Sequence, residues 1–184
     1  MPAYHITDAG EHWLEIASAF PGAEIRGPRD ASYVLPTEPW LREQFGPFLA
    51  HEFWDYNRKY IREKFDCDDF ADEAEIEATL AELADYLIGM VRGMRANMSV
   101  KAAVRSLVAN PELQGCGVAF HYCEITLRAD RSLNGVPGPG RHATNLVRTP
   151  TGWFFFEPQN SQLTPANEAL APDNGSCQLD FVLV

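Results

Sequence analysis

The first half of the chain carries apolar residues at helical spacing. Residues 11–20 repeat apolar side chains every three to four positions, and Pro21-Gly22 ends the pattern, which predicts a short helix. Residues 33–40 favour an extended segment that runs into a turn. Thr37 is then a candidate N-cap for a second helix, which we expect to end at Gly46-Pro47.

Longer helices are predicted after this point. Residues 48–64 carry aromatic side chains at three- and four-residue spacing, which is more typical of a core-facing helix than of an aromatic binding site. A further helix is expected from Cys67 to about Met94, and a short one over residues 99–109. Between Asp66 and Glu82 the chain has eight acids and no Lys or Arg.

The second half changes to a strand pattern, with alternating apolar positions rich in β-branched and aromatic residues. Strands are predicted over residues 117–128, 142–148, 153–157 and 178–184. The two middle strands form a hairpin across residues 149–152, which would set His142 and Glu157 on neighbouring strands. The Gly- and Pro-rich residues 134–140 predict a loop, and residues 158–177 predict a long surface loop.

Size and charge limit the classes of function. With 184 residues, of which 46% are apolar, the chain can bury its own core, so we expect one domain, 1–184, in which 1–32 is a candidate peripheral N-terminal segment. A net charge of -11 and a pI near 4.8 argue against nucleic-acid or anionic-membrane partners. No signal sequence and no membrane span is apparent, which predicts a soluble, cytoplasmic protein of undetermined oligomeric state.

The four cysteines lack the spacing of a zinc site or a disulfide framework. Cys116, Cys123 and Cys177 lie in apolar or strand-like sequence and are expected to be packing residues. Cys67 differs, because it lies among carboxylates at a predicted helix N-terminus. Backbone N–H groups at such a terminus favour a thiolate and can bind a developing oxyanion.

A candidate constellation follows from Cys67 together with His142 and Glu157. The thiol would be the nucleophile, the imidazole its base, and the carboxylate the group that holds the ring tautomer. Spacing alone does not select these residues from five histidines and 26 acids.

The other histidines, at positions 5, 12, 51 and 121, are expected to be structural or exposed. His142 differs from them, because a Gly-rich loop precedes it and a hairpin presents it.

The acids around Cys67 allow two interpretations. They can simply cap a solvated helix, since carboxylates complement the helix dipole. However, Asp66, Asp68 and Asp69 would raise the pKa of the thiol, and a bound divalent cation would offset that effect. Clustered oxygen ligands suit Ca2+ or Mn2+ better than Zn2+.

Three short motifs resemble a known family. They are Phe65-Asp66-Cys67-Asp68-Asp69-Phe70-Ala71, Arg141-His142-Ala143-Thr144-Asn145 and Gly152-Trp153-Phe154-Phe155-Phe156-Glu157-Pro158-Gln159. Together they resemble the papain-like, transglutaminase-like cysteine protease domain at the C-terminus of the Marasmius oreades type of mushroom agglutinin, a fungal chimerolectin with stand-alone bacterial and phage relatives. The resemblance covers residues 33 to 160. The chain has no β-trefoil lectin portion, so carbohydrate binding is not carried over.

The resemblance implies an α+β fold, papain-like or transglutaminase-like, with the nucleophile at the N-terminus of a central helix packed on an antiparallel sheet. It implies a calcium- or manganese-dependent cysteine hydrolase that acts on a peptide or amide substrate through a Cys67 thioester. Asp68 and Asp69, helped by Gln159, would bind the metal. Asn145 would order the hairpin or assist the metal shell.

Two other functions stay open at this point. One is a non-enzymatic metal-binding or phage structural module that keeps the fold, and the other is a transglutaminase-like acyl transferase.

Overall fold

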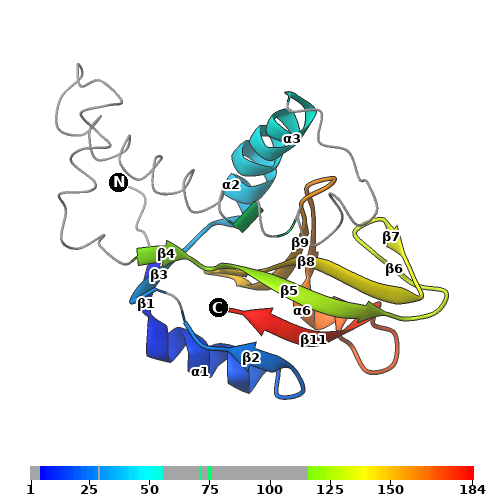
Figure 1. Cartoon of the computed structure of the whole chain (residues 1–184), viewed down its shortest axis with the longest axis horizontal. Coiled ribbons are helices and arrows are strands. Elements are labelled where there is room, and N and C mark those ends of the chain that lie inside the picture. The colour runs from blue at the N-terminus through cyan, green and yellow to red at the C-terminus, as the bar shows by residue number, and fades with distance from the viewer. Residues whose placement is uncertain (1–4, 29, 56–70, 72–73, 76–115) are drawn as a thin grey trace.

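A six-stranded mixed sheet forms the centre of the protein (Figure 1). The computed structural model describes residues 5–28, 30–55, 71, 74–75 and 116–184. The strand order is β10-β9-β8-β5-β11-β2, and all neighbours pair antiparallel except β11 and β2. These strands are β2 Glu24–Arg26, β5 Phe120–Leu127, β8 Gly140–Thr149, β9 Gly152–Glu157, β10 Gln162–Pro165 and β11 Cys177–Leu183.

Smaller sheets flank this one. A three-stranded sheet has the order β1-β3-β4, and a two-stranded ribbon joins β6 to β7. Their bounds are β1 His5–Asp8, β3 Ser32–Leu35, β4 Cys116–Val118, β6 Ser132–Leu133 and β7 Val136–Pro137. Residues 5–28, within the segment that was expected to be peripheral, add β2 to the edge of the central sheet and pair β1 with β3.

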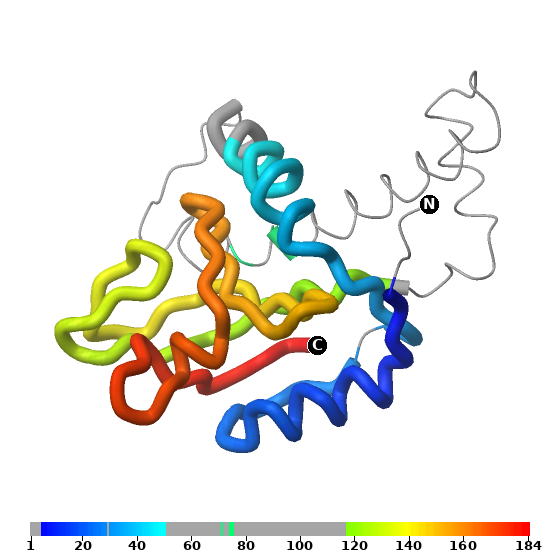
Figure 2. The backbone as a smooth tube through the Cα atoms, turned by 180° about the vertical axis from the view of Figure 1, so that it is seen from behind, coloured from blue at the N-terminus to red at the C-terminus, as the bar shows by residue number. Residues whose placement is uncertain are grey.

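Helices lie on opposite sides of the central sheet, as the views from front and back agree (Figures 1 and 2). The helix α1, Ala9–Ala19, contributes Ile16 to a core that includes Leu146 and Phe155, to which the short helix α6, Ala166–Ala169, also belongs. A second core contains Phe120 and Phe156 and is covered by three consecutive helical segments. These are α2 Glu38–Trp40, the π-helix η1 Leu41–Phe45 and α3 Gly46–Asp55. Strands β8 and β9 therefore have apolar residues in both cores.

Two helices begin at a side-chain N-cap, and the cap at Thr37 was expected from the sequence. Asp8 caps α1, since its Oδ1 accepts the Gly10 N–H at 2.8 Å. Thr37 caps α2, since its Oγ1 accepts the Trp40 N–H at 3.3 Å.

The expected helix end at Gly46-Pro47 is wrong, because the backbone continues into α3. The Gly46 N–H donates to the carbonyl of Leu41, five residues earlier. This wider turn lets the helix pass a proline, which has no N–H to donate.

The expectation of a surface loop over residues 158–177 is also wrong. This segment contains β10, which pairs with β9 from Gln162 opposite Glu157 to Pro165 opposite Phe154, and then α6. A single buried leucine, Leu163, anchors the strand in the core, which is too little apolar pattern to predict a strand.

The expected fold class, α+β with a papain-like or transglutaminase-like helix on an antiparallel sheet, is wrong as well. The described residues form a β-rich structure with mixed sheets, since β2 runs parallel to β11 and β4 parallel to β3. Apolar spacing predicts single elements, but it does not fix strand partners, because these parallel pairs join residues far apart in the sequence. Among the described residues, no helix is long and apolar enough to cross a membrane.

Candidate functional site

The hairpin of β8 and β9 places His142 beside Glu157, as the sequence predicted. Asn145 to Thr149 pair with Phe156 to Gly152, so the two strands are in regular register up to Asn145. Thr149 fixes the turn, because its Oγ1 donates to the Gly152 carbonyl at 3.1 Å. The pairing brings Glu157, at the end of β9, within reach of His142, near the start of β8.

The His142 imidazole and the Glu157 carboxylate form a buried hydrogen-bonded pair. His142 Nε2 lies 2.6 Å from Glu157 Oε2, and the two side chains are only 7% and 1% exposed. The second carboxylate oxygen, Oε1, accepts the backbone N–H of Gln159 at 3.3 Å. An ionised carboxylate only accepts hydrogen bonds, so Nε2 carries a proton here and Nδ1 is the basic nitrogen when the ring is neutral.

Further polar contacts hold this end of the hairpin. Thr144 Oγ1 donates to the Phe156 carbonyl at 2.7 Å, one residue before Glu157. Asn134 Nδ2 donates to the Phe155 carbonyl at 3.1 Å, and Asn160 Nδ2 donates to the Asn134 carbonyl at 2.7 Å. Residues 134–140, expected to be only a loop, include β7, and Asn134 attaches this segment to β9.

Of the remaining predicted site residues, only Gln159 lies within the part of the chain that the structure describes. Gln159 is exposed, and its backbone rather than its side chain contacts Glu157. Cys67, Asp68 and Asp69 lie outside the described residues. Within the described ranges, no group of three or more His, Cys, Asp or Glu side chains could hold a metal ion, so Ca2+ or Mn2+ binding stays a prediction.

Between Cys67 and Cys116 the structure describes three residues, Ala71, Ala74 and Glu75, and all three are helical. Asn145 Nδ2 donates to the Ala71 carbonyl at 2.8 Å, and the Tyr122 N–H donates to Glu75 Oε2 at 2.9 Å. Asn145 was expected to order the hairpin or assist a metal shell. Its side chain binds the backbone carbonyl of Ala71, a long-range contact that sequence spacing does not indicate.

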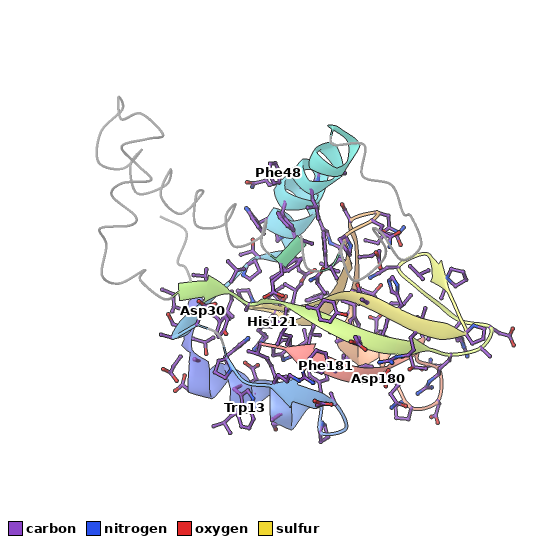
Figure 3. All side chains as sticks on the ribbon, viewed as in Figure 1. Trp13, Asp30, Phe48, His121, Asp180 and Phe181 are labelled. Carbon is purple, nitrogen blue, oxygen red and sulfur yellow. The ribbon has the colours of Figure 1, made fainter. Side chains whose placement is uncertain are left out.

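A second buried contact involving imidazoles, between His12 and His121, was not predicted from the sequence. His12 of α1 and His121 of β5 were expected to be structural or exposed, and both are buried, with their Nε2 atoms 2.7 Å apart. Figure 3 shows His121 in the interior of the molecule, and Trp13 marks the helix that brings His12 to it. Burial and the nearby Arg148 guanidinium lower the pKa of His12 to about 4, and burial and His12 hold the pKa of His121 well below its usual value.

Two of the remaining cysteines are packing residues, as expected. Cys123 and Cys177 are free thiols, and both are fully buried. Burial raises the pKa of Cys177 to about 12 and raises that of Cys123 well above its usual value.

Solved structures similar to the fold of this chain are known. No protein-family model and no curated protein matches the sequence. One similar structure is a complex of the Polyporus squamosus lectin PSL1a with E64, with a TM-score of 0.53 and 17% identity over 97% of this chain and 50% of that one. Another is Polyporus squamosus lectin bound to the human-type influenza-binding epitope Neu5Acα2-6Galβ1-4GlcNAc, with a TM-score of 0.53 and 19% identity over 97% of this chain and 49% of that one. The chain therefore spans about half the length of the chains it matches, and the likeness is one of fold.

These comparisons overturn the resemblance drawn from the three motifs. The similar structures are described as lectin chains and not as a protease domain, so the papain-like, transglutaminase-like assignment is wrong on this finding. The expected function, a calcium- or manganese-dependent cysteine hydrolase acting through a Cys67 thioester, is overturned with it. Neither description names a transglutaminase or a phage structural protein. The physical reason is that short motifs report local sequence, whereas a fold depends on how distant segments pair.

Proposed function

We propose that His142 and Glu157 are the proton-transfer group of a catalytic site, with Cys67 as the thiol that exchanges a proton with the imidazole. The observation that carries this proposal is the buried 2.6 Å contact between His142 Nε2 and Glu157 Oε2. Such a contact orients the ring and leaves Nδ1 as the nitrogen that can exchange a proton during a reaction.

The burial of this pair supports a functional role. Taking a carboxylate and an imidazole out of water is costly, and one hydrogen bond between them does not make the pair more stabilising than apolar residues of the same volume. Titratable pairs that a fold keeps in spite of that cost are concentrated at functional sites.

The position of the acidic segment supports the choice of Cys67. Ala71 follows Cys67 by four positions, and its carbonyl is bound by Asn145, three residues after His142 on the same strand. Four residues span at most about 14 Å, so the chain between Ala71 and Cys67 is of a length that allows the thiol to reach the imidazole.

The test is the rate at which iodoacetamide alkylates Cys67, followed by peptide mass spectrometry from about pH 5 to about pH 9. We expect His142→Gln to lower the rate at neutral pH by at least about tenfold, and Glu157→Gln to lower it by a smaller factor. His5→Gln, which changes an exposed histidine on β1, is the matched control. Equal rates in the wild type and all three variants would show that the pair is only a structural hydrogen bond.

Carbohydrate binding is a second candidate function, and the description of one similar structure as a lectin bound to a sialylated trisaccharide favours it. This chain offers a groove of about 470 Å³ whose lining includes the aromatic rings of Phe20 and Trp153 beside the polar side chains of Thr151 and Asn167. Apolar walls with a few polar groups are typical of small-molecule sites.

Isothermal titration with Neu5Acα2-6Galβ1-4GlcNAc tests this candidate, with Asn167→Ala as the groove variant. Asn167 is exposed at the start of α6, so its truncation should leave the fold intact. Binding that weakens by about tenfold or more in the variant supports the groove, since a lost polar contact is worth about 1.4 kcal/mol or more. No measurable binding at millimolar trisaccharide removes the candidate.

A further inference from the structure

The groove that Phe20 and Trp153 line is joined to the buried histidine pair through the indole ring of Trp153. Phe20, at the C-cap of α1, meets that ring edge-on, with ring centroids 5.5 Å apart. His12, on the same helix, stacks on the ring at a centroid distance of 5.5 Å and an interplanar angle of 27°. The helix that carries His12 therefore also carries one wall of the groove, which is formed by Ala19 and Phe20.

The closed arrangement accommodates a neutral His12 and not a charged one. Nε2 of His12 lies 2.7 Å from Nε2 of His121, and both side chains are buried. Nδ1 of His12 has no hydrogen-bond partner within the part of the chain that the structure describes. A charged imidazole has an N–H on both nitrogens, so the N–H on Nδ1 would be buried without an acceptor, which is unfavourable.

The groups around the pair also oppose a positive charge. Burial and the Arg148 guanidinium of β8 lower the pKa of His12 to about 4. Glu15, the carboxylate one turn after His12 on α1, is engaged by Arg148 at 2.7 Å. From β3, Tyr33 packs against both imidazoles, and its hydroxyl accepts the Asp30 N–H at 3.3 Å. His12 therefore takes up a proton more readily when α1 is away from the sheet.

Between the two elements that carry the pair, α1 is the one that can move. His121 lies on β5, which is hydrogen-bonded to β8 on one side and to β11 on the other. The helix lies on the sheet through side chains such as Ile16, and the Ala9 N–H ties its first residue to the Ala31 carbonyl at 3.1 Å. Release of α1 leaves the hydrogen bonds of the sheet intact, and such local opening requires less free energy than global unfolding.

We propose that the His12–His121 pair is a proton-sensitive latch that holds α1, and with it one wall of the groove, on the central sheet. Proton uptake by the pair releases α1, so that Phe20 leaves Trp153 and the groove loses that wall. For ligand binding, this inference rests on the second candidate function, because it concerns the same groove. The release of the helix itself needs no ligand.

Hydrogen exchange followed by mass spectrometry tests the latch at about pH 7.5 and about pH 5, with the intrinsic pH dependence of exchange divided out. The Phe20 N–H, which donates to the Ile16 carbonyl at 2.9 Å, reports the opening of α1. A pKa of 6.5 in the open helix and of about 4 in the closed one predicts that its protection falls by about thirtyfold at the lower pH. At that pH, α1 should also exchange at least about tenfold faster than β8, which shows that the opening is local.

Two variants complete the test. His12→Gln/His121→Asn has no imidazole at the pair, and we expect α1 to lose its pH dependence. His5→Gln, at an exposed position of β1, is the matched control and should behave as the wild type. If the double variant does not fold, the comparison of α1 with β8 in the wild type decides alone.

The latch is overturned if the protection of α1 is the same at both pH values, if α1 and β8 are equally protected at pH 5, or if the folded double variant keeps the wild-type pH dependence. Titration with Neu5Acα2-6Galβ1-4GlcNAc at the same two pH values separates this result from the candidate function. Binding at least about tenfold weaker at pH 5 supports control of the groove, and equal binding despite release of α1 overturns it. Release of α1 with no binding at either pH removes the candidate function and supports the latch.

Discussion

Acid should destabilise this protein through the buried pair of His12 and His121. The two Nε2 atoms are 2.7 Å apart, so one ring donates a single N–H to the other, and a second proton between them would have no acceptor. The pair is enclosed by Tyr33 of β3 and Trp153 of β9. The charged group that acts on it is Arg148 of β8, which is itself paired with Glu15 of α1 at 2.7 Å.

The sign of the effect follows from the lowered pKa of His12, which falls from 6.5 to about 4 on folding. The unfolded chain binds a proton on this ring below about pH 6.5, whereas the folded chain does not until about pH 4. The stability that depends on the neutral ring is therefore fully present above pH 6.5 and is lost as the pH falls toward 4. For His12 alone the loss is about 2 kcal/mol at pH 5 and approaches about 3 kcal/mol at lower pH. The lowered pKa of His121 acts in the same direction.

Urea unfolding followed by tryptophan fluorescence, at a series of pH values from about 7.5 to about 4.5, measures this effect. The double variant His12→Gln/His121→Asn has no imidazole to protonate at these positions. Between these pH values the free energy of unfolding should fall in both proteins. We expect the fall in the double variant to be smaller than the fall in the wild type by at least about 2 kcal/mol. His5→Gln, at an exposed position, is the control and should follow the wild type. Parallel pH profiles for the wild type and the double variant would refute the reasoning.

Three further predictions concern the core, the thiols and the metal. Phe155→Ala, at a fully buried position of β9, should lower the free energy of unfolding by about 3–5 kcal/mol in urea titrations, whereas Leu14→Ala, at a position 62% exposed on α1, should change it by less than about 0.5 kcal/mol. Cys177 should resist a thiol reagent near pH 8 in the folded protein and react promptly in urea, because burial raises its pKa to about 12; prompt labelling in the folded state contradicts this. Ca2+ or Mn2+ should raise the unfolding temperature, chelation should reverse the rise, and Asp68→Asn/Asp69→Asn should abolish it; an equal rise in that variant would exclude these carboxylates as ligands.

Local patterns predicted most single elements correctly. The helix over residues 11–20, the extended residues around Tyr33, the strand after Gly117 and the last strand are all present within two or three residues of their expected bounds. These elements depend on caps, turn residues and apolar spacing within a few positions of one another, which a sequence displays directly. The weakly patterned β10 and the π-turn before Gly46 were missed, because one buried leucine or one shifted hydrogen bond leaves no such pattern.

In the candidate site, too, the contact between neighbouring strands could be predicted from the sequence, and the long-range contacts could not. The contact of His142 with Glu157 could be predicted because a short hairpin joins the two residues, and the turn sets the register. The contacts of Asn145 with Ala71 and of His12 with His121 could not be predicted. Asn145 lies 74 positions after Ala71 in the sequence, and His121 lies 109 positions after His12. No local rule specifies contacts between residues so far apart.

By itself, the sequence determined the acidic charge, the N-cap at Thr37 and the hairpin that brings an imidazole to a carboxylate. Tertiary structure decided that β2 would run parallel to β11 at the edge of the sheet, that two histidines would meet in the core, and that a buried amide on β8 would bind the Ala71 carbonyl. The physical reason is the range of the interactions. Caps and turns depend on neighbouring residues, whereas strand partners and buried polar contacts form only where the whole chain makes the surrounding core favourable.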